Sequence, residues 1–269
     1  MRLKTASLLV MPAVLASVAT LFWQASASSA SNSANAKQPV IVELFTSEGC
    51  SDCPPADTLL KRLAEEQPID GVEIIPLEEH VDYWNHQGWN DPFSSVDFSV
   101  RQNDYTVVFP KAGGPYTPQM VVDGHAQFIG SRANEALEQI RAAGAQPKAH
   151  LLLSLAPGSK PHTYNVDLRL DPDSPAPSAS SLDFYLAVTE KGLHSTPNAG
   201  ENSGAALTHA PVVRQLRKLH SIKLPLTAPV SNTISLKDNW NPSSLTVVAF
   251  LVNPKTHQIQ AAGDVSLPN

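Results

Sequence analysis

Residues 40–77 constrain the fold most, because a strand, an amphipathic helix and a second strand follow one another there. "VIVELFT" (40–46) is apolar and rich in β-branched residues, and "VEIIPL" (72–77) has the same character. Between them, apolar residues recur at the spacing of one helical face: Ala56, Leu59, Leu60, Leu63 and Ala64. A strand–helix–strand unit of this length predicts a right-handed crossover and a partly parallel sheet.

Two cysteines, Cys50 and Cys53, lie directly before the predicted helix and are the only ones in the chain. Pro54 and Pro55 predict that the helix begins at this point, since proline is tolerated in a first turn. Backbone N–H groups and the helix dipole stabilise a thiolate there. We therefore expect an exposed, attacking Cys50 and a resolving Cys53. The alternative is a static disulfide, although a loop this short restricts little of the unfolded chain's entropy.

The rest of the first half predicts an irregular insertion, a hairpin and a closing helix. Residues 78–116 are less periodic, with a helix expected over 98–109. In "QMVVDGHAQFIG" (119–130), Asp123-Gly124 stands between two apolar runs and predicts a tight turn. Ser131 is positioned to cap a final helix. The element order is therefore β-α-β-(insertion)-α-β-β-α.

Beyond Gly144 the pattern becomes that of β-structure. "TYNVDLRL" (163–170) and "LDFYLAVT" (182–189) alternate as half-buried strands do, and "LTVVAFLV" (245–252) predicts a central strand. We expect an α/β domain over residues 38–144, followed by a mostly antiparallel β-sandwich domain over 145–269.

The N-terminus has the pattern of an export signal. Arg2 and Lys4 precede an apolar run over residues 6–23, and Ala25-Ser26-Ala27 is a small-residue cleavage pattern. We expect a signal peptide over 1–27, a linker over 28–37, and a periplasmic or secreted protein with no stable membrane span after processing. An uncleaved anchor is the alternative. The net charge of −6 and the absence of a Lys/Arg cluster argue against a nucleic-acid partner.

Several stretches together resemble the thioredoxin superfamily over about residues 38–144. The wider pattern is similar to a bacterial family of secreted thioredoxin-like proteins of unassigned function, through "ELFTSEGCSDCPPAD", "HVDYWNHQGWNDPFSS", "YTPQMVVDG" and "GENSGAALTHAPVVRQL". The resemblance implies a thioredoxin-like fold and a C-x-x-C redox centre acting on protein thiols and disulfides, with no cofactor. It also implies that Pro118 is cis and faces the cysteines. Fold alone does not assign the activity.

The resemblance and the local sequence name further candidate residues. Thr117, beside Pro118, resembles the residue pair of thiol-disulfide isomerases, and Tyr116 and Trp84 are candidates to contact a partner chain. Trp84 has a simpler interpretation, as an aromatic side chain that anchors the insertion over the sheet. These residues predict a reductase or isomerase with an unknown redox partner.

Two carboxylates lie close to the motif in the sequence, and a histidine and a third carboxylate follow the second predicted strand. Glu48 and Asp52 flank Cys50 and disfavour its thiolate, which argues against a strong oxidant. His80 and Asp82 follow the second predicted strand. They form either a hydrogen-bonded pair or support for the thiols.

Two other functions stay open at this stage. Thiolates and an imidazole suit copper, so Cys50, Cys53 and His80 are an alternative metal site, without a clear fourth ligand. A non-catalytic binding module with a structural disulfide is the other alternative. In "GENSGAALTHAPVVRQL", polar residues are expected to satisfy the backbone of a shaped loop or an interface: Glu201, Asn202, His209 and Arg214.

Overall fold

The computed structural model describes residues 37–268. The predicted signal peptide and nearly all of the predicted linker lie outside these residues. Within the described part, no helix is long and apolar enough to cross a membrane.

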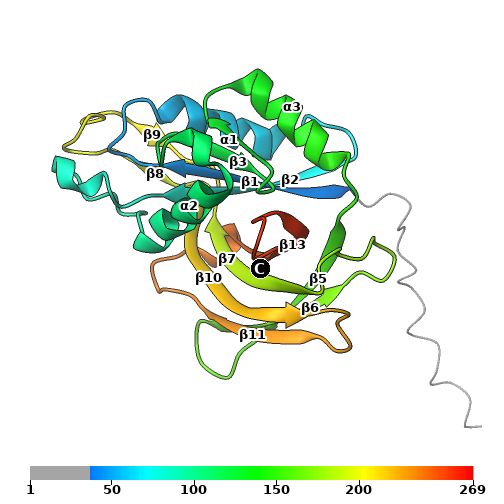
Figure 1. The fold of residues 1–269 in the computed structure, drawn as a ribbon. Helices are drawn as coiled ribbons and strands as arrows, with labels where there is room; N and C mark the ends of the chain where they lie inside the picture. Colours follow the sequence, from blue (N-terminus) through cyan, green and yellow to red (C-terminus); the bar gives the residue numbers. More distant parts are fainter. Residues whose placement is uncertain (1–36, 269) are drawn as a thin grey trace, which may run out of the picture. The chain divides into compact units, whose positions relative to one another are not determined.

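The first half follows the predicted element order, with short 3-10 helices added in the insertion (Figure 1). Its elements are β1 (Gln38–Thr46), α1 (Pro54–Glu66), β2 (Val72–His80), η2 (Asn85–Gln87), α2 (Val96–Val108), η3 (Pro110–Ala112), β3 (Gln119–Val122), β4 (Ala126–Ile129) and α3 (Ala133–Gly144). β1 and β2 are parallel, as predicted, whereas β3 is antiparallel to both β1 and β4. The predicted cap is wrong in detail: α3 has Arg132 at its N-cap and no side-chain cap.

The second half is built of strands and one short 3-10 helix in the described residues. They are β5 (Ala149–Pro157), β6 (Thr163–Leu170), β7 (Ser181–Glu190), β8 (His194–Ser195), β9 (Leu207–Thr208), β10 (Val212–Lys223), β11 (Val230–Ser235), η4 (Pro242–Ser244), β12 (Leu245–Val252) and β13 (Ile259–Ser266). β12 lies between β7 and β13 and is almost entirely buried, which confirms the predicted central strand. β7 does not alternate as expected: it is buried on both faces, because Phe184 and Leu186 pack in one apolar cluster and Tyr185 and Ala187 in another.

A mixed sheet runs through both halves. Its eleven strands, among the described residues, have the order β11-β6-β5-β13-β12-β7-β10-β2-β1-β3-β4. The junction between β10 and β2 is short, with Val212 opposite Glu78 and the Glu78 N–H donating to the Pro211 carbonyl at 3.1 Å. The sheet therefore does not stop at residue 145, and the predicted division into two domains is not established by it.

An apolar cluster that includes Ile41, Leu77, Tyr185 and Phe250 crosses this junction, and further clusters hold the sheet on each side of it. One packs α1 and α3 against β1, β2 and β3, through residues such as Leu44, Leu60 and Ile140. Another lies among β5, β6, β7, β10, β11 and β12, where Val166, Phe184 and Val247 are buried. The Ile259 N–H donates to the Asp123 carbonyl at 3.0 Å, so β13 begins against the β3–β4 turn.

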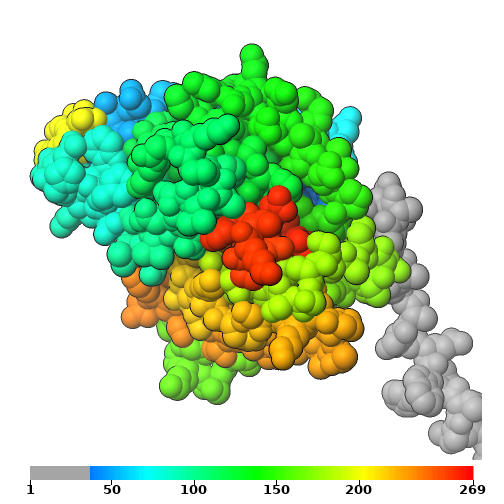
Figure 2. Space-filling view, viewed as in Figure 1, coloured from blue at the N-terminus to red at the C-terminus, as the bar shows by residue number. Residues whose placement is uncertain are grey.

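Figure 2 shows the contact between the two halves on one face of the molecule, where the red C-terminal residues lie against the green residues of the first half. The end of the chain is therefore packed against the first half as well as against its own neighbouring strands.

Candidate functional site

Cys50 and Cys53 form a disulfide at the start of α1, with their Cα atoms 5.4 Å apart. Cys53 is the N-cap residue, and Pro54 is the first residue of the helix, as predicted. The Cys53 carbonyl accepts hydrogen bonds from the N–H groups of Ala56 and Asp57. The disulfide thus closes the turn that leads from β1 into the helix.

The predicted exposure of Cys50 is wrong for this disulfide-bonded form. Cys50 is 2% exposed and Cys53 is fully buried, whereas Ser51 and Asp52 between them are exposed. The physical reason is a loop from the second half of the chain that lies over the turn.

That loop connects β8 and β9 and holds the motif by hydrogen bonds. Asn202 Nδ2 donates to the carbonyl oxygens of Glu48 and Cys50, both at 2.9 Å. The Ser51 N–H donates to Glu201 Oε2 at 2.9 Å, and this bond lowers the pKa of Glu201. Glu201 and Asn202 thus bond the backbone of the C-x-x-C turn and not that of their own loop, which agrees with the expected alternative of an interface. His209 and Arg214 contact the carboxylates of Glu78 and Glu190 instead.

A cavity of about 310 Å³ lies beside the motif. Its lining includes Ser51 and Asp52 from the motif and Tyr116, Thr117 and Pro118 from the segment before β3. The Thr117–Pro118 peptide bond is cis, as expected. Among the candidate residues, Tyr116, Thr117 and Pro118 therefore share a cavity with the exposed part of the motif, whereas Trp84 and the two cysteines do not line it.

Trp84 joins the insertion to the segment that precedes β3. Its Nε1 donates to Thr117 Oγ1 at 2.8 Å. A Cβ atom at Gly49 would lie 3.3 Å from the Trp84 Cβ. Trp84 therefore packs against the motif loop and is partly buried, which agrees with the simpler interpretation of an anchoring aromatic residue.

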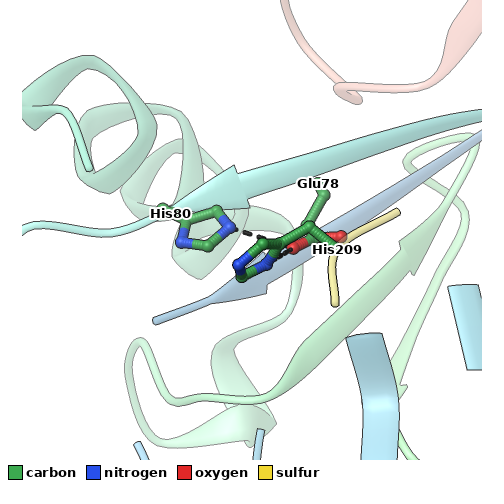
Figure 3. A group of neighbouring side chains, drawn as sticks. All are labelled: Glu78, His80 and His209. Atoms are coloured by element: carbon green, nitrogen blue, oxygen red, sulfur yellow. Dashed lines mark hydrogen bonds and ion pairs between the residues drawn. The ribbon is translucent and has the colours of Figure 1, made fainter. Parts of the chain in front are cut away.

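A buried network of histidines and carboxylates lies next to the motif loop. Figure 3 shows three of its members, Glu78, His80 and His209. His80 Nε2 and His209 Nδ1 each lie 2.9 Å from the same oxygen, Glu78 Oε1. His80 Nδ1 lies 2.7 Å from Asp91 Oδ2, which also accepts the Glu48 N–H at 2.9 Å. The motif loop, β2, the insertion and the second half therefore meet in one network.

Glu48 belongs to this network and does not lie free beside Cys50. Its Oε2 accepts a hydrogen bond from Trp89 Nε1 at 2.6 Å, and its Oε1 lies 3.3 Å from His209 Nε2. His209 Nε2 forms its hydrogen bond with Ser195 Oγ, which lies 3.0 Å away. Its contact with Glu48 is therefore an attraction between charges and not a hydrogen bond. Of the two carboxylates expected beside the thiols, only Asp52 is exposed at the motif.

The network raises the affinity of its histidines for protons. Burial by itself would lower the pKa of His80, but the charge and hydrogen bond of Asp91 outweigh it and hold that pKa well above the usual value. For His209, burial is likewise outweighed, by its contacts with Glu48 and Glu78, and the pKa rises to about 9. Burial opposes ionisation of Glu78, yet the two imidazoles lower its pKa. Without a bound cation, the histidines therefore carry positive charge between carboxylates at neutral pH.

Asp57 supplies a further buried carboxyl group, four residues after Cys53. Burial, followed by the charge of Glu78, raises the pKa of Asp57 to about 8. Its Oδ1 accepts a hydrogen bond from Thr46 Oγ1 at 2.6 Å. This acid keeps its proton at neutral pH, within the helix turn that follows the disulfide.

His80 pairs with Asp91 and Glu78 rather than with Asp82. Glu78 and His80 are two residues apart on β2 and so share one face, whereas Asp82 follows the strand and accepts a hydrogen bond from Ser99. That spacing was the available signal for Glu78. Nothing local in the sequence indicated Asp91 or His209, since His209 contacts Glu78 across 131 residues. As for the alternative copper site, Cys50 and Cys53 are joined to each other in this form, and both ring nitrogens of His80 face carboxylates.

Comparison with known proteins found a matching family and a distant relative. Residues 41–252 match the family described as "Protein of unknown function (DUF1223)". A thioredoxin from Methanocaldococcus jannaschii is 28% identical over 98 residues, which are 36% of this chain and 87% of the thioredoxin.

Two solved structures have a similar fold over 86% of this chain. One is a protein of Agrobacterium tumefaciens from a structural genomics programme, with a TM-score of 0.58, 21% identity and 94% of its own length covered. The other is HBP35 of Porphyromonas gingivalis, with a TM-score of 0.59, 17% identity and 76% of its length covered. At these identities the likeness concerns the fold alone.

Proposed function

Because this chain belongs to the family described as "Protein of unknown function (DUF1223)", which names no activity, we propose its function from the site: an exported thiol-disulfide oxidoreductase. The observation that carries the proposal is the Cys50–Cys53 disulfide at the start of α1, beside a cavity lined by Ser51 and Pro118. The weak similarity to a thioredoxin supports it.

In the proposed reaction, the reduced protein transfers two electrons to a protein disulfide. The Cys50 thiolate attacks one sulfur of the partner, and the other partner sulfur leaves as a thiolate. The Cys53 thiolate then attacks Cys50 in the mixed disulfide, which re-forms the Cys50–Cys53 bond and releases the second partner thiolate. A separate dithiol reductant must return the electrons. Run in reverse, the same steps oxidise a partner dithiol.

Two carboxyl groups near the motif, the buried Asp57 and the exposed Asp52, affect this chemistry. Asp57 has a pKa of about 8, so it keeps its proton at neutral pH, and it lies in the first turn of the helix, four residues after Cys53. We propose that it exchanges protons with the thiols. The negative charge of Asp52 opposes a thiolate at Cys50. This charge favours a reductase or isomerase over a strong oxidant.

The proposed organisation is a thioredoxin-like domain over residues 38–144 and an appended β-sandwich over 145–269. The short β10–β2 junction supports this division, and an apolar cluster that contains Ile41 and Phe250 joins the two parts across it. In this organisation the second part supplies the loop that carries Asn202 over the motif.

Export to the periplasm or to the outside is part of the proposal. It rests on the N-terminal sequence pattern, and such compartments permit disulfides. Mass spectrometry of the protein isolated from the cell envelope should find a chain that lacks about the first 27 residues. An intact Met1 or Arg2 on that protein would refute processing.

The test of activity is insulin reduction by the protein in the presence of dithiothreitol. We expect the wild type to accelerate precipitation of the insulin chains, and Cys50→Ser to abolish the effect. Wild-type protein that behaves like Cys50→Ser would contradict the proposed reductase.

A static disulfide in a binding module is the second candidate function. The observation in its favour is burial, since Cys50 is 2% exposed and Cys53 is not exposed at all. The two candidates differ in whether the disulfide exchanges with a partner.

A further inference from the structure

Three potential ligand atoms converge in the buried network: Glu78 Oε1, His80 Nε2 and His209 Nδ1. Both nitrogens lie 2.9 Å from the same carboxylate oxygen, and the three side chains are 0–2% exposed. Figure 3 shows the two imidazole rings directed toward Glu78. Glu78 and His80 come from one face of β2, and His209 follows β9 from the other half of the chain.

The remaining nitrogen of each ring is held by an outer partner. His80 Nδ1 lies 2.7 Å from Asp91 Oδ2, and His209 Nε2 lies 3.0 Å from Ser195 Oγ and 3.3 Å from Glu48 Oε1. Metal-binding histidines are oriented in this way, with one nitrogen on the cation and the other donating to a carboxylate or hydroxyl oxygen. The second Glu78 oxygen is fixed as well, because it accepts the Ala210 N–H.

The size of the space is compatible with a small cation. The three ligand atoms all lie within 4.8 Å of one another. Bonds of about 2.0–2.2 Å to nitrogen and oxygen place tetrahedral ligand atoms about 3.3–3.5 Å apart. The two 2.9 Å contacts would therefore have to lengthen by only about 0.5 Å.

The charges also suit a divalent ion. Among the described residues, Glu78, Asp91 and Glu48 bring three carboxylates to a buried site, and the imidazoles of His80 and His209 face them. A divalent cation between neutral imidazoles supplies the same positive charge as two imidazolium rings. Two imidazoles and a carboxylate are a ligand set used for Zn²⁺ and its neighbours in the first transition row.

We propose that Glu78, His80 and His209 bind one divalent transition-metal cation, with Zn²⁺ as the expected occupant. Asp91 orients His80, Ser195 and the charge of Glu48 orient His209, and none of these three residues binds the ion itself. The site joins β2 to the second half of the chain and, through Glu48, to the loop that carries Cys50. It is distinct from a site on the two thiolates, and it does not depend on redox activity.

The first test is zinc binding by chelator-stripped protein with the disulfide intact, measured by titration calorimetry, with Co²⁺ as the spectroscopic probe. We expect one equivalent to bind, and a visible d–d spectrum of four- or five-coordinate Co²⁺. The Cys50→Ser/Cys53→Ser double variant should bind equally well, which separates this site from thiolate ligation.

Variants then identify the ligands. Glu78→Gln, His80→Ala and His209→Ala should each weaken Zn²⁺ binding by at least tenfold, and Asp91→Asn by about 10- to 100-fold through loss of the partner of His80. His86→Ala is the matched control: His86 is exposed, comes from the same insertion as Asp91, and bonds the Tyr83 carbonyl. It should bind zinc as the wild type does.

Several results would overturn the proposed metal site. Wild-type protein that binds no Zn²⁺ or Co²⁺ would show that the network holds protons only. Binding that survives in His80→Ala and His209→Ala, or falls equally in His86→Ala, would place the ion elsewhere. If the ligand variants do not fold, X-ray absorption of the zinc-loaded wild type decides: two imidazoles with oxygen ligands support the site, and a different ligand set overturns it.

Discussion

Asn202 Nδ2 lies 2.9 Å from the carbonyl oxygen of Cys50, 152 residues earlier in the chain. The bond exists because β10 joins the sheet beside β2, which brings the β8–β9 loop over the motif. Gly200, with φ of 76°, lies in the same loop, where a Cβ atom would be 3.8 Å from the Gly49 Cα. The second half of the chain therefore determines how accessible the disulfide is.

Asn202→Ala should loosen this cover. Two carbonyl oxygens would lose their donor, at a cost of about 1–3 kcal/mol in the free energy of unfolding if they stay buried. We also expect faster reduction of the Cys50–Cys53 disulfide by dithiothreitol, measured by quenched alkylation and mass spectrometry. Asn198→Ala, at an exposed position of the same loop, is the matched control. Equal reduction rates in wild type and Asn202→Ala would show that the loop does not limit access.

Asp57 should make stability depend on pH. The pKa of Asp57 is about 8 in the folded protein, whereas the usual value for an aspartate is 3.8. The folded state therefore holds a proton that the unfolded state releases, so this group's contribution to stability is largest below about pH 4 and falls until about pH 8. Asp57→Asn keeps an acceptor for Thr46 and removes that slope, with a gain above pH 8 of at most about 6 kcal/mol.

Urea unfolding of wild type and Asp57→Asn at a series of pH values checks this expectation. The stability difference between them should grow from pH 5 to pH 8. Asp70→Asn, which changes an exposed aspartate after α1, should show no such growth. Parallel stability curves for wild type and Asp57→Asn would mean that Asp57 is ionised in the folded protein.

The buried pair of Lys148 and Asp123 should matter for stability. Lys148 forms an ion pair with Asp123 and also donates to the Pro39 carbonyl at 2.7 Å, while the Ile41 N–H donates to Asp123 Oδ1. Lys148→Met leaves the carboxyl group buried without its cation and should cost about 3–5 kcal/mol in the free energy of unfolding.

Chemical denaturation measures that loss, with Lys160→Met as the control at an exposed lysine. Asp123→Asn combined with Lys148→Met should recover part of the loss, because no unpaired charge then remains. A Lys148→Met protein as stable as wild type would show that the pair contributes nothing.

The sequence predicted the elements better than their assembly. Periodicity gave the bounds of β6 and β12, and the prolines gave the start of α1. These signals are local, since they depend on neighbouring side chains that share a face. The Asp123-Gly124 turn was predicted for the same reason, and both residues have positive φ.

Contacts between the two halves were beyond such patterns. The β10–β2 junction has a single aligned pair, and the contacts of Asn202 and His209 with the first half span more than a hundred residues. Cys50 was expected to be exposed because only its own segment was considered. In the candidate site, therefore, the cysteines and Pro118 could be predicted, but the cover over them and the partners of His80 could not.

The central claim is that the Cys50–Cys53 pair exchanges disulfides with a protein partner, and trapping of the mixed disulfide tests it most directly. Cys53→Ser protein is incubated with an untreated disulfide-containing substrate or, as the control, with the same substrate after reduction and alkylation. Both mixtures are then analysed by non-reducing electrophoresis and mass spectrometry. The account predicts a species joined through Cys50 that forms only with the untreated substrate and disappears on reduction, because no second thiol resolves it. It predicts no such species for Cys50→Ser/Cys53→Ser. Absence of any Cys50-linked species would contradict exchange and leave the disulfide a structural crosslink.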